Sequence, residues 1–444
     1  MPPDVPSSWT DRFRLALERY DEPLLRQVAN KLCKPRNQWP TEELIERCLA
    51  TVANPAVIDR RLADLDPGGL QLLALFGHSR QPRWRVGHLV EMAVALGQAD
   101  GLRPVLALLE AGLLFPDAGA AGGKARLRNL HTWLAQSGGA HPVVVALPEI
   151  TARALELGAP FPECPGATAA ANAGAQEADG LDWPLRLSAL WQQVHAGPLR
   201  RTQSAGFFKR DLDRLRGDAV LNAAAPDHLT DIPDPALLAV LLATGEGLLH
   251  DSDGELRAGI FPASWEEGLP QALAGLWATL LQQDSWHLSD GWRPETRSAY
   301  PYPSAWLLTL VLLSRLPPDG WAQVTRLEQW MVRHHPFWRG DEPAACGLSA
   351  FLLGLAYPLR LIQVGRDAKH HGLVRLSALG RWLLGVGPLP ALPAFPHTLL
   401  VQPNLEILAY RQGLTPALIA RLAKLATWKT LGAACTLQDR KSVV

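Results

Sequence analysis

The chain has 444 residues, enough for about three domains, and its 48% of hydrophobic residues excludes a mainly disordered protein. Lysine and arginine together number 43, as do aspartate and glutamate, so the net charge is zero. This balance excludes a basic field over the whole protein. Any contact with nucleic acid must come from local clusters of basic side chains, because phosphate binding needs gathered positive charge.

The start of the chain and its cysteines favour a soluble protein of a reducing compartment. Residues 1–10 are polar and rich in proline and serine, unlike a signal segment. The longest apolar stretches, such as 305–313, are too short to span a bilayer. The five cysteines form no CxxC pair and are odd in number, which argues against a disulfide framework and a structural zinc site. We therefore expect a cytoplasmic protein without a membrane partner.

Residues 1–65 are expected to form a helical segment. Leu24, Leu25, Val28 and Leu32 recur at helical spacing. Thr41 is a candidate N-cap for the next helix, because carboxylates follow it in the first turn.

Residues 66–158 predict a winged-helix-like domain, in which three helices are closed by a β-hairpin. The expected helices cover residues 70–76, 86–96 and 102–111. Gly112 is a candidate C-cap glycine. The expected strands are 113–115 and, after a turn rich in glycine and alanine, 126–128.

A second succession of the same elements follows a predicted linker. Residues 159–182 are rich in alanine, glycine and proline and show little periodicity, as linkers do. Residues 183–260 then predict another winged-helix-like domain. Its expected helices are 185–194, 207–215 and 235–243, and its expected strands are 198–200, 248–250 and 255–257. Asp253-Gly254 is a strong hairpin signal between the last two strands.

Residues 261–390 predict a third winged-helix-like domain. Its expected helices are 306–313, 321–332 and 347–356, and its expected strands are 359–364 and 373–376. Ser377 is expected to cap a closing helix that runs through Leu384.

Residues 391–444 change in character and predict a small α/β domain. The expected strands are 398–401, 405–408 and 433–437. Thr415 is expected to cap a helix that has Pro416 at its favoured first position. The whole chain is therefore predicted to be mainly α with small β-hairpins, an α+β fold of tandem winged-helix-like domains followed by a partial α/β domain.

The last segment also resembles a known family. The run from Leu399 to Leu408, which contains Gln402-Pro403-Asn404, resembles the opening of the N-terminal domain of XPB/Ssl2-type helicases. Residues 415–426 and 432–437 are similar to its continuation, so the resemblance covers about the last 50 residues. The winged-helix copies resemble bacterial helicase-associated proteins that carry this domain. The resemblance implies a DNA-linked role beside a helicase or a repair protein. Since the family pattern would continue past Leu437, we expect the final domain to be truncated and the last six residues to be foreign to it.

Catalytic motifs are missing, so we expect no enzyme activity, no cofactor and no metal. Gly123-Lys124 has Ala118 and Ala125 where a phosphate loop needs glycine and serine or threonine. The Asp-Glu pairs at 21–22 and 341–342 follow no strand and precede proline. The histidine pairs 334–335 and 370–371 lack ligand partners at metal-binding spacing.

Basic side chains gather in two places, which we take as candidate nucleic-acid-binding sites. The first is in the second winged-helix copy, where Thr202, Gln203 and Ser204 could also donate to phosphate. The second is on the third wing, near His370 and His371. The candidate residues are Arg200, Arg201, Lys209, Arg210, Arg214, Arg366, Lys369 and Arg375. The alternative is a solvated face with internal ion pairs, such as Asp211 with Arg214.

Two functions follow from this pattern. The first is a helicase-associated, non-catalytic protein that binds nucleic acid, DNA above all, without strong sequence specificity. The alternative is a protein-interaction scaffold built from winged helices, which the zero net charge and the long leucine-rich helix faces favour.

Overall fold

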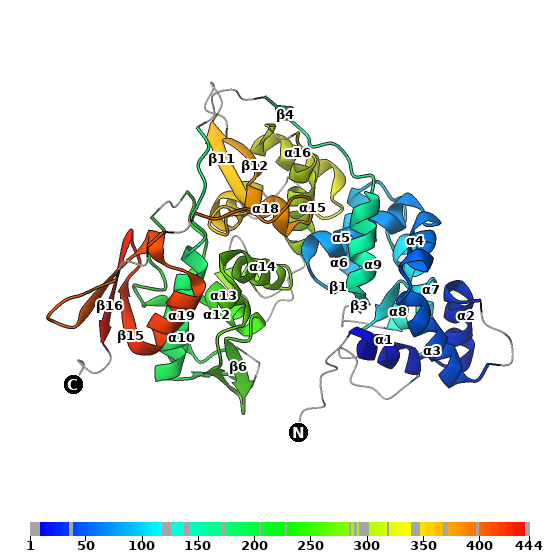
Figure 1. The fold of residues 1–444 in the computed structure, drawn as a ribbon, viewed down its shortest axis with the longest axis horizontal. Coiled ribbons are helices and arrows are strands. Elements are labelled where there is room, and N and C mark those ends of the chain that lie inside the picture. Colours follow the sequence, from blue (N-terminus) through cyan, green and yellow to red (C-terminus); the bar gives the residue numbers. More distant parts are fainter. Residues whose placement is uncertain are drawn as a thin grey trace. The chain divides into compact units, whose positions relative to one another are not determined.

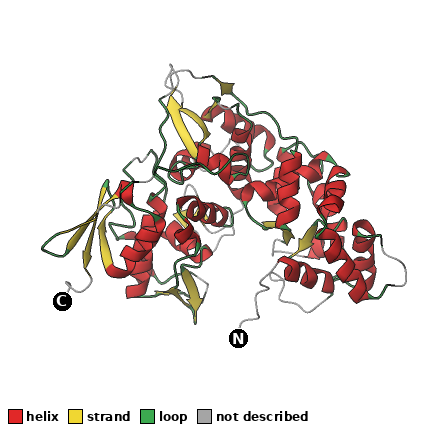
Figure 2. Ribbon diagram, viewed as in Figure 1, coloured by secondary structure: helices red, strands yellow, loops and turns green. Residues whose placement is uncertain are grey.

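The computed structural model describes most of the chain. The described residues are 9–34, 39–117, 126–136, 142–169, 174–203, 206–226, 229–283, 286–287, 291–292, 302–317, 319–338, 347–366, 372–393, 395–396 and 399–439. The structure is 52% helical with small antiparallel sheets, which confirms the predicted α+β class (Figure 2). Among these residues no helix has the length and apolarity needed to cross a membrane.

The chain divides into two compact units, which are described separately. The first consists of Met1–Pro162 with Arg333–Phe337, and the second of Glu163–Val332 with Trp338–Val444. Figure 1 labels many of the helices and strands of both units, numbered in chain order.

The first unit begins with four helices, as the periodicity of residues 1–65 predicted. They are α1 (Trp9–Glu18), α2 (Glu22–Leu32), α3 (Thr41–Val52) and α4 (Pro55–Ala63). The side chain of Asp21 caps α2 by accepting a hydrogen bond of 3.0 Å from the Leu24 amide, which gives the first Asp-Glu pair a structural role. The prediction that Thr41 caps α3 is wrong by one residue. Pro40 is the N-cap residue instead. Its backbone is extended (ψ 161°), as is that of Asp21, the N-cap residue of α2 (ψ 166°).

Three copies share one order of elements, which is helix, strand, helix, helix, strand, strand, except that the first copy has one more helix between its last two strands. The first copy is α5 (Pro67–Ser79), β1 (Arg83–Arg85), α6 (Val86–Ala95), α7 (Leu102–Glu110), β2 (Leu114–Pro116) and β3 (Val143–Ala146). Its sheet order is β1-β3-β2, so the strand between the first two helices pairs with the last strand. This is the predicted winged-helix arrangement, with one more strand than expected. Gly112 follows α7 with φ +68°, as its predicted capping role requires.

The return strand of this first wing was wrongly placed at 126–128. In the structure only Leu127 bridges there, and its partner is Tyr20 rather than β2. The true return strand, β3, comes after helix α8 (Leu130–Gln136). Helix α9 (Pro148–Leu157) follows β3 and packs on α5.

The second copy matches the prediction closely. It comprises α10 (Asp182–Ala196), β5 (Leu199–Arg200), α11 (Lys209–Arg216), α12 (Pro235–Gly245), β6 (Leu249–Ser252) and β7 (Glu255–Ala258). Its sheet order is β5-β7-β6. Ser252 pairs with Glu255, so Asp253 and Gly254 alone form the turn, both with positive φ (+54° and +80°). That is the tight hairpin that Asp-Gly predicts.

Two helices and a small ribbon precede the third copy and were not predicted. They are α13 (Ser264–Glu267), α14 (Leu269–Leu280), β8 (Trp286–His287) and β9 (Gly291–Trp292). The third copy is α15 (Tyr302–Ser314), β10 (Trp321–Gln323), α16 (Val324–His334), α17 (Leu348–Phe351) with a π-helical turn η1 (Leu352–Ala356), β11 (Ile362–Arg366) and β12 (Gly372–Leu376). Ser377 caps the closing helix α18 (Ala378–Leu383), as predicted.

The segment predicted as a linker takes part in the third sheet. Strand β4 (Ala167–Thr168) pairs with β10, which gives the order β11-β12-β10-β4. Gln176 bridges to Val364 on the opposite edge of that sheet. Composition suggested a linker because alanine, glycine and proline carry little periodicity, yet their backbone groups can still pair with a strand edge.

The C-terminal module consists of β13 (Leu399–Val401), β14 (Glu406–Tyr410), a 3-10 turn η2 (Arg411–Gly413), α19 (Pro416–Leu425), β15 (Ala426–Thr430) and β16 (Ala434–Asp439). The sheet order is β13-β14-β16-β15. Thr415 caps α19, and its Oγ1 lies 3.2 Å from the Leu418 amide nitrogen. Strand β15 was not predicted. Helix α19 packs on α10 of the second copy.

Candidate nucleic-acid interface

The arginines at the start of the second copy are held by carboxylates. Arg200 lies on β5, and its Nε is 3.1 Å from Oδ2 of Asp211 on α11. The Arg200 backbone N–H donates to the same oxygen at 3.1 Å. Burial would raise the pKa of Asp211, but the two hydrogen bonds from Arg200 outweigh it and hold this pKa below its ordinary value. Asp211 therefore pairs with Arg200, and not with Arg214 as the alternative interpretation supposed.

Arg201 is paired across the hairpin. Its Nε lies 2.8 Å from Oδ2 of Asp251 on β6, and its guanidinium group lies 5.2 Å from the centre of the Phe207 ring. In the same way, the Arg200 guanidinium lies 5.1 Å from the centre of the Phe208 ring. These contacts place both cations on aromatic rings at the strand edge, where cation–π attraction and ion pairing restrain them.

Two further arginines brace α11. Arg214 donates from Nη2 to the Gly197 carbonyl oxygen at 2.9 Å. Arg216 forms a two-point ion pair with Asp234, with N–O distances of 2.9 and 3.1 Å. Both side chains tie α11 to neighbouring segments of the same copy, so their main role in the structure is to position this helix.

Lys209 and Arg210 differ from these four arginines. Both are exposed on the first turn of α11, and neither forms an ion pair with another residue in the described part of the chain. Both residues belong to the first turn of the helix, where backbone N–H groups also favour anions. Thr202, Gln203 and Ser204 were expected to donate hydrogen bonds to phosphate. The Thr202 backbone N–H donates to the Gly206 carbonyl oxygen, and Ser204 lies outside the described residues.

Among the residues that the structure describes, the third wing has one exposed cation. Arg366 ends β11 and is exposed, whereas Lys369, His370 and His371 lie outside the described residues. The side chain of Arg375 on β12 is only partly exposed. Its Nε donates to Oε1 of Gln363 at 2.7 Å, and its guanidinium lies 4.4 Å from the Trp321 ring centre. The structure thus brings Arg375 into the sheet rather than to an open surface.

The third helix of the second copy and that of the third copy are core elements. In helix-turn-helix proteins this is the helix that reads base edges in the major groove. Here α12 has the sequence PALLAVLLATG without a basic residue, and Ala236 to Val240 are buried. The equivalent α17 and η1 are equally apolar. These two helices have no side chains for reading bases, a feature that the prediction of the patches did not consider.

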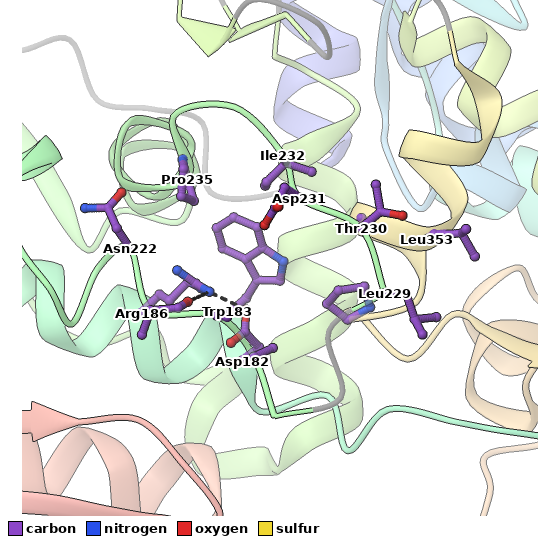
Figure 3. Close-up of a pocket in the computed structure, with 15 residues that line it drawn as sticks. Asp182, Trp183, Arg186, Asn222, Leu229, Thr230, Asp231, Ile232, Pro235 and Leu353 are labelled. Atoms are coloured by element: carbon purple, nitrogen blue, oxygen red, sulfur yellow. Dashed lines mark hydrogen bonds and ion pairs between the residues drawn. The ribbon is translucent and has the colours of Figure 1, made fainter.

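A pocket of about 90 Å³ lies beside α10 and is drawn in Figure 3. Arg186 and Asp182, both more than nine-tenths buried, form an ion pair of 2.8 Å at its wall. Arg186 also donates to the carbonyl oxygens of Leu221 and Ala223. Figure 3 shows the Trp183 indole in the middle of the group. The two charges of this wall therefore satisfy one another and the backbone acceptors.

Other candidate chemistry gains no support from the geometry. The described residues contain no group of three side chains suited to hold a metal ion. The rejected phosphate-loop candidate at 119–124 and the Asp341-Glu342 pair lie outside the described residues.

No protein-family model matches this chain, and none of the curated proteins matches it either.

Proposed function

We propose that this chain is a non-catalytic accessory protein that binds DNA through its phosphates, without reading base sequence, and works in the cytoplasm beside a helicase or repair protein. The observation that carries the proposal is the exposure of Lys209 and Arg210 on α11, where neighbouring arginines are held in ion pairs. The apolar third helices of the second and third copies support binding that is independent of sequence, since phosphate contacts carry no base information. The resemblance of residues 399–437 to the XPB/Ssl2-type N-terminal domain supports the link to a helicase.

A salt series tests this function directly. Binding to two duplexes of unrelated sequence is measured by fluorescence anisotropy between low and moderate salt. Each phosphate contact releases counterions and contributes a slope of about −0.9 to log K against log salt, so two to four contacts predict a slope of about −2 to −4. The two duplexes should bind equally. A flat salt dependence, or no binding at low salt, would contradict the proposal.

A second candidate is a protein-interaction scaffold, and one observation favours it. Strand β13 is the edge of the C-terminal sheet, and all three of its residues are exposed although they are Leu, Leu and Val. Such an edge can accept an apolar strand from a partner protein, whose backbone would continue the sheet. Loss of partner binding on Leu400→Lys, together with an absence of DNA binding in the salt series, would select this function instead.

A further inference from the structure

Two consecutive phenylalanines lie between strand β5 and helix α11, and the second of them is exposed. Phe207 is 8% exposed, and its backbone bridges to that of Arg201. The backbone of Phe208 is extended (φ −63°, ψ 139°). Since successive side chains of an extended chain point to opposite sides, the burial of Phe207 directs the Phe208 ring, which is 46% exposed, to solvent.

The exposed ring is held in place by its neighbours. The Phe208 N–H donates to the Arg200 carbonyl oxygen at 3.2 Å, and the Arg200 guanidinium lies 5.1 Å from the centre of the ring. Arg200 is itself fixed by Asp211, since its Nε and its backbone nitrogen each lie 3.1 Å from Oδ2 of that residue. A ring that is already fixed loses little conformational freedom when a flat ligand stacks on it.

Exposed positive charge surrounds this ring. Lys209 and Arg210 follow Phe208 directly and are both exposed, and the Arg200 side chain is 46% exposed. The ring of Phe395 has nearly the same exposure, 47%, but no lysine or arginine lies within ten residues of it in the sequence. Phe395 is therefore an internal comparison, an exposed ring without the charge that would attract a polyanion.

We propose that Phe208 is a stacking site for an unpaired base of single-stranded DNA, whose phosphates lie against Lys209 and Arg210. The inference rests on the proposed function and names the form of DNA that uses this part of the surface. Bases in a duplex are stacked on one another, so a strand with unpaired bases is needed to cover the ring. Because every base has an aromatic face, such stacking adds affinity without reading sequence.

The test compares three labelled probes in fluorescence anisotropy titrations of the full chain at low salt. The probes are a thymidine strand, an abasic strand of the same length and a duplex. The thymidine and abasic strands carry the same phosphates, so a difference between their affinities measures contacts with the bases. The unaltered chain should bind the thymidine strand about fivefold or more tightly than the abasic strand.

Substitutions at the ring locate the effect. Phe208→Leu keeps an exposed apolar side chain but has no aromatic face. It should bind the thymidine strand about fivefold or more weakly than the unaltered chain does, with unchanged affinity for the abasic strand and the duplex. Phe208→Trp should retain the preference for thymidine. The matched control Phe395→Leu should bind all three probes as the unaltered chain does.

The stacking site is wrong if the unaltered chain binds the thymidine and abasic strands equally. It is also wrong if Phe208→Leu and Phe395→Leu weaken binding to the thymidine strand alike. Duplex binding that keeps its salt dependence in either case leaves the proposed function intact, so the two failures are distinguishable. An absence of binding to all three probes contradicts both proposals. The comparison of the two strands needs no variant, so a folding defect cannot be mistaken for its result.

Discussion

Arg411 and Asp179 form a two-point ion pair, with Nε 2.5 Å from Oδ2 and Nη2 3.0 Å from Oδ1. Arg411 follows β14 of the C-terminal module, and its side chain is 6% exposed. Asp179 lies just before α10, in the segment whose composition predicted a linker. The pair therefore anchors this segment to the C-terminal module and gives it a structural role.

Replacing Asp179 by asparagine should destabilise the second unit by about 1–3 kcal/mol. The change removes the charge nearest to the buried guanidinium of Arg411, while the partial exposure of Asp179 and the charge of Asp182 limit the loss. Urea unfolding measures the effect. The control is Arg421→Ala, which breaks an exposed pair with Glu266 and should cost under about 1 kcal/mol. Equal effects of both changes would contradict the structural role.

Gln192 makes a second link, between α10 and the C-terminal module. Its Nε2 donates to the carbonyl oxygens of Ala423 (2.9 Å) and Ala426 (2.5 Å), and its Oε1 accepts from the Trp428 N–H at 3.0 Å. Because all these groups are buried, Gln192→Leu should cost about 2–4 kcal/mol of unfolding free energy. The neighbouring Gln193→Leu is the matched control. It removes one contact with Asp218, of 2.7 Å, and should cost about 1 kcal/mol or less. A smaller effect at position 192 than at 193 would count against the link.

The elements that sequence predicted well are those that one or two residues determine locally. Asp253-Gly254 forms its turn because glycine and aspartate tolerate positive φ, and Thr415-Pro416 starts α19 because the hydroxyl caps and proline fixes the first turn. Strand β3 was not predicted, because no residue within it determines its structure locally. It exists because it pairs with β1 and β2, and the nearer run 126–128 looked equally suited as a return strand.

Strand β15 and the basic side chains of the second copy also depend on partners that are distant in the sequence. Residues 426–430 continue an apolar helical pattern, and the contact with Gln192, far away in sequence, holds the backbone at the point where it turns into a strand. In the patch, sequence gives the sign of each charge but not its partner. Nothing near Arg201 in the chain indicated that Asp251 would neutralise it.

The proposed DNA binding should depend on the two exposed cations of α11. The double variant Lys209→Glu with Arg210→Glu should weaken binding about tenfold or more at low salt and reduce the salt slope, equally for unrelated duplexes. The matched control is Arg421→Glu with Lys424→Glu, which makes the same charge change on the exposed surface of α19. If the control weakens binding as strongly as the α11 variant, the effect reflects net charge alone and the site on α11 is wrong.

His335 should make the first unit less stable in mild acid. Its side chain is buried, and burial lowers its pKa to about 4; the charge of Glu91 opposes this and His88 adds to it. The ordinary value is 6.5, so below that pH the unfolded chain takes up a proton that the folded chain does not. Stability is therefore fully present above about pH 6.5 and falls as the pH drops toward about 4, by about 3 kcal/mol over the whole window.

Substitution isolates this contribution. In His335→Gln the side chain no longer titrates, so the loss of stability between about pH 7 and about pH 4.5 should shrink by roughly 2–3 kcal/mol relative to the unaltered chain. The matched control is His334→Gln, which makes the same substitution at the neighbouring exposed position at the end of α16. Urea unfolding at a series of pH values measures both. If His335→Gln loses as much stability on acidification as the unaltered chain does, burial of His335 does not hold its pKa down.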